Sequence, residues 1–110
     1  MNDSFVFNFK NYKMKKFIIE RNLPGAGNMT AEELRDVSRT SNAVVTLLNR
    51  PYTWIHSYIT GDKIYCIHEA ESEADIREHA ECGNFPINSI SEILTVIDPT
   101  TAGENPVTCF

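Results

Sequence analysis

The sequence has few cysteines, no excess of positive charge and no long apolar stretch. Its 110 residues include three cysteines, an odd number without CxxC spacing, so neither a disulfide framework nor a zinc knuckle is expected. Ten basic side chains face fifteen acidic ones, which argues against a nucleic-acid ligand because phosphate backbones attract basic proteins. Apolar runs are only a few residues long, so the sequence offers no membrane span.

The composition is that of one globular domain. With 42% apolar and 23% charged residues, a chain of this length can bury a single core without cross-links. No secretory signal is recognisable, because the basic residues Lys13, Lys15 and Lys16 are followed by only a short apolar run before Glu20. We therefore expect a cytoplasmic protein.

The hydrophobic pattern predicts six elements in the order strand, helix, strand, strand, helix, strand. Alternating apolar residues mark the strands, and apolar residues at helical spacing mark the helices. The expected elements are strand 17–21, helix 31–49, strands 53–60 and 63–70, helix 73–82 and strand 90–97. Thr30 and Glu33 are spaced as a capping box, Ser72 is the expected cap of the second helix, and Gly83 is its expected stop.

This order of elements is that of the α+β, ferredoxin-like βαββαβ fold, a four-stranded antiparallel sheet with two helices on one face. Two helices of this length cannot cover both faces, so we expect the other face to meet a partner or a ligand. The expected division is an N-terminal extension 1–13, the domain 14–100 and a C-terminal tail 101–110. The extension is interpreted as a flexible addition or, alternatively, as an edge strand or partner-binding arm.

The middle strands are predicted to form a hairpin closed by Gly61 and Asp62. Strict alternation then divides their side chains between two faces. The helix side would carry Ile55, Ser57, Ile59, Ile64, Cys66 and His68, and the open side would carry Trp54, His56, Tyr58, Tyr65, Ile67 and Glu69. The open side would expose a large apolar patch, which a second copy of the chain would cover in a homodimer.

His56 is the main candidate for function, because a neutral imidazole suits nickel, zinc or copper. Glu69 is a diagonal neighbour of His56 across the hairpin, and Glu20 lies on the strand expected beside it. A Cys66 and His68 pair is a less complete metal candidate. All of these have structural interpretations as well: an interface histidine bonded to a carboxylate, charges at strand ends, and buried core residues.

Several segments resemble a small bacterial family named after a nickel-responsive, nickel-binding protein of Streptomyces. The similar segments are 17–21, 54–58, 63–66, 76–80 and 96–99, and the most specific are W-x-H-S-Y and D-K-x-Y-C. The resemblance implies a ferredoxin-like fold, a homodimer and a divalent metal, nickel in the namesake. Glu20, His56, Ser57 and Tyr58 match the family pattern, whereas His68 stands where an aromatic or aliphatic residue is expected.

The first hypothesis is therefore a non-enzymatic homodimer that binds a divalent transition metal, nickel first, through His56 with Glu20 or Glu69. The alternative is a dimeric α+β barrel enzyme or small-molecule-binding protein, in which His56 acts as a base and Tyr58 or Tyr65 as a donor. A plain dimeric interaction module is the third. The expected pocket or interface residues are Trp54, Tyr58, Tyr65 and Ile67.

Overall fold

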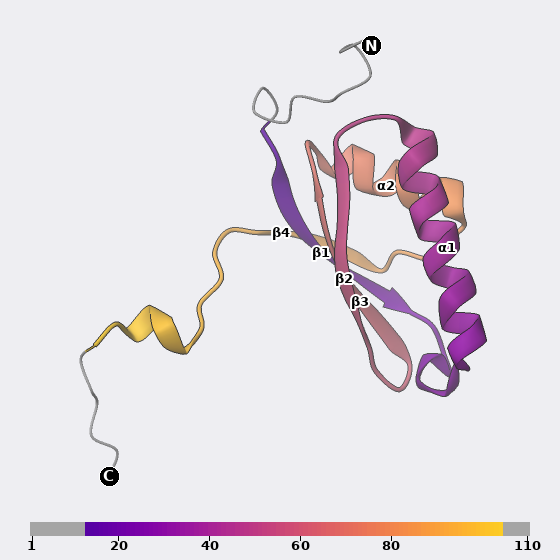
Figure 1. Cartoon of the computed structure of the whole chain (residues 1–110), viewed down its shortest axis with the longest axis horizontal. Helices are drawn as coiled ribbons and strands as arrows, with labels where there is room; N and C mark the ends of the chain where they lie inside the picture. Colours follow the sequence, from indigo (N-terminus) through magenta and orange to yellow (C-terminus); the bar gives the residue numbers. More distant parts are fainter. Residues whose placement is uncertain (1–12, 105–110) are drawn as a thin grey trace, which may run out of the picture.

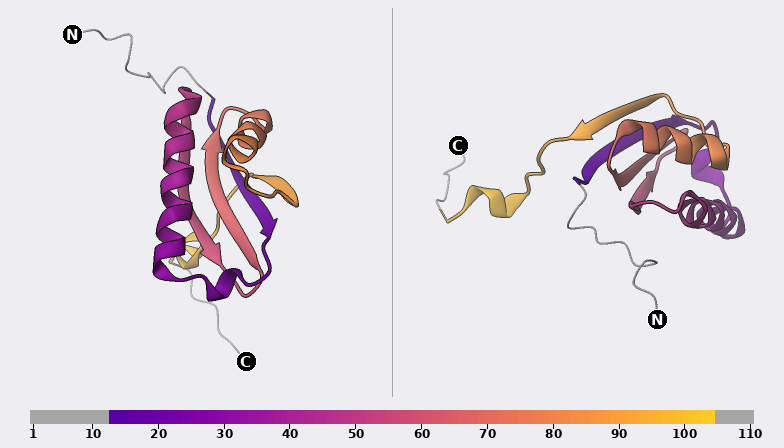
Figure 2. Two further views of the ribbon diagram at one scale, coloured as in Figure 1. Left: turned by 90° about the vertical axis from the view of Figure 1, so that its right-hand side faces the viewer. Right: turned by 90° about the horizontal axis from the view of Figure 1, so that it is seen from above.

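The computed structural model describes residues 13–104 and places two helices on one face of a four-stranded sheet (Figures 1 and 2). The elements are β1 (Lys15–Asn22), η3 (Ala26–Asn28), α1 (Ala31–Leu48), β2 (Tyr52–Ile59), β3 (Lys63–Ala70), α2 (Glu73–Gly83), β4 (Ser89–Ile93) and η4 (Pro99–Ala102). The strand order is β2-β3-β1-β4, and all pairs are antiparallel. The predicted βαββαβ order is confirmed. Most of the predicted N-terminal extension, residues 1–12, lies outside the described residues.

Helix α1 begins at the predicted capping box. The Thr30 side chain accepts a hydrogen bond from the Glu33 amide at 3.1 Å, and the Glu33 carboxylate accepts one from the Thr30 amide at 2.8 Å. Asn49 then ends the helix in the left-handed conformation, with φ at 51°. No helix among residues 13–104 is long and apolar enough to cross a membrane.

Helix α2 starts at Ser72 as predicted, but its end differs from the prediction. Gly83 is the last helical residue, and Asn84 takes the left-handed cap conformation with φ at 58°. The glycine serves close packing, because a Cβ atom at position 83 would lie 2.3 Å from the Phe85 ring. Asn tolerates the left-handed conformation better than most residues, so it replaces Gly at the cap.

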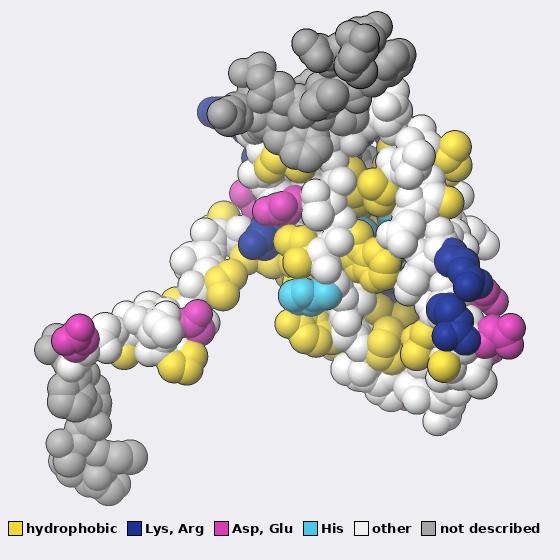
Figure 3. All heavy atoms as spheres, in the orientation of Figure 1, with side chains coloured by type: hydrophobic (Ala, Val, Ile, Leu, Met, Phe, Trp, Pro, Cys, Tyr) yellow, Lys and Arg dark blue, Asp and Glu magenta, His cyan; other side chains and the backbone are white. Residues whose placement is uncertain are grey.

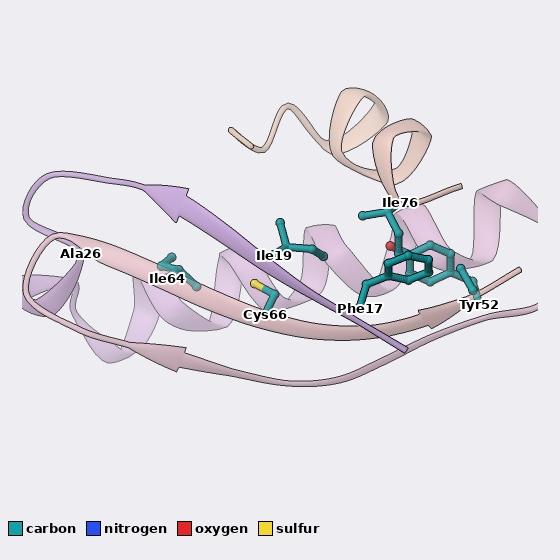
Figure 4. Packing of buried hydrophobic residues seen from close by; sticks show 8 residues of the cluster. Phe17, Ile19, Ala26, Tyr52, Ile64, Cys66 and Ile76 are labelled. Atoms are coloured by element: carbon teal, nitrogen blue, oxygen red, sulfur yellow. The ribbon is translucent and has the colours of Figure 1, made fainter. Parts of the chain in front are cut away.

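The core lies between the sheet and the helices (Figure 4). On β1, Phe17 and Ile19 face the helices and are 4% and 0% exposed. Ile76 of α2 packs on them and is fully buried. Complete burial of such a side chain stabilises the fold by about 1.5–3 kcal/mol.

A β-bulge in β2 changes the predicted arrangement of the hairpin. Close to the loop the register is as predicted, and His56 pairs with Ile67. Trp54, however, pairs with His68, which leaves Ile55 as an extra residue in β2. Because a bulge opposes two residues to one, alternation restarts on the other side of it. The prediction that Trp54 shares the open face with His56 is therefore wrong: Trp54 faces the helices, like its buried partner His68.

The last strand is shorter than predicted. β4 ends at Ile93, which pairs with Lys16. Only one strand residue of β1 precedes Lys16, so at most one further pair could form. The following segment leaves the sheet and extends away from the body (Figures 1 and 2). Its apolar side chains are largely exposed: Leu94 at 85%, Val96 at 68% and Ile97 at 75%.

Candidate functional site

The open face of the sheet carries the exposed histidine. His56 lies on β2, and its ring packs edge-on against Tyr58, with 4.9 Å between ring centroids. Tyr58 pairs with Tyr65 of β3, and Ile67 is the partner of His56. Figure 3 shows a histidine at the surface, among hydrophobic side chains. Four of the predicted residues thus share one face, and their role in binding stays a prediction.

The two predicted carboxylate ligands lie apart. The Glu20 carboxylate accepts hydrogen bonds from the ammonium group of Lys63 and from the Ser89 hydroxyl, the latter at 3.2 Å. The bond from Lys63 is the main reason that the pKa of Glu20 is below its usual value. Glu20 pairs with Tyr65, and Glu69 lies four residues further along β3, which is about 13 Å of strand. Both carboxylates therefore cannot belong to one site built by a single chain.

Glu69 is the carboxylate nearer to His56 in the strand register. It lies two residues beyond Ile67, the cross-strand partner of His56, so the two are diagonal neighbours as predicted. Across β1 it faces Lys16, at a shallow groove beside β4. Within residues 13–104, no three side chains of the His, Cys, Asp and Glu types gather as a metal-binding group.

The other two histidines are core residues. His68 and His79 are each 1% exposed. Burial lowers the pKa of His68 to about 3 and that of His79 to about 4, so both are neutral at physiological pH. The Tyr52 hydroxyl and Nδ1 of His68 form a hydrogen bond of 2.5 Å. Tyr52 itself is buried, and burial raises the pKa of its phenol.

A cavity of about 170 Å³ lies on the helix side of the sheet. Its walls come from both helices, from three strands and from Phe85. Leu34, Val37, Ser41, His79, Arg21, Trp54, Ile64 and His68 are among the lining residues. Leu34 and Val37 are 37% and 36% exposed although they belong to the apolar stripe of α1, because the first half of this helix does not close onto the sheet. The predicted pocket residue Trp54 lines this cavity, away from His56.

Arg21 is the feature of this cavity that the sequence interpretation missed. It is only 4% exposed and alternates with Phe17 and Ile19 on the helix side of β1. That alternation was visible in the sequence, because Phe17, Ile19 and Arg21 occupy every second position and therefore share one face of the strand. Charged side chains are rarely buried, because removing a charge from water is costly, so the burial of Arg21 requires an explanation.

Comparisons with known proteins agree with the fold. The sequence profile of the family described as "Nickel responsive protein SCO4226-like" matches residues 17–93, which include all the candidate site residues. The crystal structure of SCO4226 from Streptomyces coelicolor A3(2) superimposes with a TM-score of 0.61 and 21% identity, over 74% of this chain and 99% of that one. A similarity at this identity establishes the common fold. The comparison with curated proteins gave no match.

Proposed function

The chain belongs to the SCO4226-like family of nickel-responsive proteins, and from this membership we propose that it binds a divalent transition metal, nickel first, as a non-enzymatic homodimer. One observation carries the proposal. His56 is the only exposed histidine of the three, and its ring nitrogens have no hydrogen-bond partner among the described residues. An exposed, unengaged imidazole is available to a metal ion.

A second copy of the chain completes the ligand set. One chain offers His56 and, diagonally, Glu69, which is fewer ligands than a divalent transition metal takes. A two-fold axis passing close to His56 would bring two imidazoles to one ion, with water in the remaining positions. Glu20 is held by Lys63, so it joins the site only when the metal displaces that ammonium group.

Two uncovered apolar surfaces support the dimer. The first is the open sheet face, on which Tyr58 is 58% exposed beside Tyr65 and Ile67. The second is the segment after β4, with Leu94 and Ile97 largely exposed. Exposed apolar surface of this kind is typical of an interface, and a symmetric partner would cover it.

The test is calorimetric titration of the metal-stripped protein with Ni²⁺. We expect binding by the unmodified chain, and a loss of about tenfold or more in affinity for His56→Ala. Thr53→Ala, an exposed change on the same strand, is the matched control and should bind as the unmodified chain does. Acidic pH should release the metal, because a protonated imidazole cannot coordinate it. Absence of binding heat with Ni²⁺, Cu²⁺ and Zn²⁺ would refute the proposal, and sedimentation of a monomer at assay concentration would refute the dimer.

The alternative function, an enzyme that uses His56 with Tyr58 or Tyr65, requires a substrate cavity beside these groups. The cavity lined by Trp54 lies on the opposite face of the sheet, and neither tyrosine lines it. This placement favours metal binding over proton transfer as the role of His56.

A further inference from the structure

The cavity on the helix side contains a buried positive charge without a negative partner. Nε of Arg21 donates to Sγ of Cys66 at 3.4 Å, and Nη1 donates to the Pro86 carbonyl oxygen at 2.8 Å. The guanidinium carbon lies 5.4 Å from the centroid of the Phe85 ring. None of the ion pairs within residues 13–104 involves Arg21. The neutral partners hold the guanidinium in place and leave its charge uncompensated.

Such a charge is costly, and arginine cannot avoid the cost by releasing its proton. Its effect reaches the neighbouring histidines, because the charge of Arg21 adds to burial in lowering the pKa of both His68 and His79. The interior of the cavity is therefore electropositive. It repels a metal cation and attracts an anion.

His79, a side chain with an unsatisfied polar atom, lines the same cavity. Nε2 of His79 is within hydrogen-bonding distance of the Ser41 hydroxyl, at 3.3 Å, and of the Ser41 carbonyl oxygen, at 3.4 Å. Nδ1 is buried and has no partner among the described residues. The ring is stacked between Tyr52 and Phe85, with centroid distances of 4.9 and 5.6 Å, so it cannot turn away to find one. Buried polar atoms without partners are rare in native proteins and call for a missing group.

Most of the remaining cavity wall is apolar. Leu34 and Val37 of α1 lie across from Ile59 and Ile64 of the hairpin. The Trp54 indole lines the same space, and its N–H donates to the Ser57 hydroxyl at 3.0 Å, so it needs no ligand. An apolar cavity of about 150 Å³ accommodates benzene. This cavity, of about 170 Å³, accepts a molecule of similar size with a small polar head.

We propose that this cavity binds a small organic monocarboxylate with a compact apolar body, the size of benzoate or isovalerate. The carboxylate accepts hydrogen bonds from Arg21 and supplies the missing negative charge. His79, in the tautomer whose Nε2 accepts from the Ser41 hydroxyl, donates its Nδ1–H to the same polar head. The apolar body fills the space between α1 and the sheet. The site lies on the other face of the sheet from His56, so the outcome of its test does not depend on whether the protein binds a metal at His56.

The chain contains a single tryptophan, and its indole lines this cavity, which gives a specific reporter. We expect benzoate and isovalerate to shift the one indole N–H resonance of the full chain in a saturable manner, with a dissociation constant of about 1 mM or below. Benzamide, which has the same shape without the charge, should bind about tenfold more weakly. No saturable shift with either acid, or equal binding of benzamide, would overturn the proposal.

Two variants locate the site without adding a second tryptophan. Val37→Phe fills the cavity while Arg21 stays in place, and it should weaken benzoate binding about tenfold or more. Leu47→Phe is the matched control on the same helix, at a position that is 72% exposed, and should bind as the unmodified chain does. Arg21→Gln should remove the preference for benzoate over benzamide. If Val37→Phe folds and binds benzoate normally, the anion binds elsewhere and the assignment is wrong.

Discussion

Mild acid is expected to destabilise this protein through its two buried histidines. His68 and His79 have pKa values of about 3 and about 4 in the fold, against the ordinary value of 6.5. Below pH 6.5 the unfolded chain takes up protons that the folded chain refuses, so stability is complete above that pH and declines as the pH falls toward the folded pKa values. At about pH 5 each histidine costs the fold about 2 kcal/mol, and the two together about 4 kcal/mol. Typical domains have only about 5–15 kcal/mol in total.

Urea unfolding at about pH 7.5 and about pH 5 measures this loss. The acid measurement is made at about pH 5 because carboxylates with lowered pKa values, such as Glu20, take up protons only at lower pH. His79→Gln should lose about half as much stability between the two pH values as the unmodified chain loses. Thr53→Ala, an exposed change that involves no titratable group, is the control and should show the full loss. If His79→Gln shows the full loss, or if the unmodified chain shows none, the burial of these rings does not control the acid response.

Two further changes test the local packing. Gly83→Ala places a Cβ atom against the Phe85 ring and should destabilise the fold by about 1–3 kcal/mol, whereas Gly61→Ala, which meets open space, should have little effect in the same urea assay. Thr30→Ala removes the capping box of α1 and should cost about 1 kcal/mol, whereas Thr46→Ala, at an exposed position within the helix, should cost less. Equal effects within either pair would contradict the assigned role.

The elements that local rules specify were predictable. The spacing of Thr30 and Glu33 indicates the start of α1, and Gly61 and Asp62 determine the register of the hairpin near its loop. The bulge at Ile55 was not predictable, because an isoleucine between Trp54 and His56 suits a regular strand and carries no sign of being an extra residue. Trp54 was therefore predicted on the wrong face of the sheet, whereas His56 and the residues between it and the loop lie on the predicted faces.

The candidate sites divide in the same way. The gathering of aromatic residues around His56 follows from alternation alone, so the sequence was sufficient to predict it. The cavity depends on how far α1 stands from the sheet, and this is a property of tertiary packing that no periodicity encodes. Arg21 was the available clue, since it breaks the apolar parity of β1. The end of β4 at Ile93 depends likewise on where its partner β1 begins.

The extra residue in β2 has a consequence for how relatives of this protein are compared. A relative that lacks it would present the residue aligned with Trp54 to the opposite side of the sheet, even where both sequences have tryptophan there. Residue identity upstream of position 55 therefore does not guarantee equivalent location. An alignment that places its gap one position away would assign the indole to the open face of the sheet in one protein and to the interior of the other.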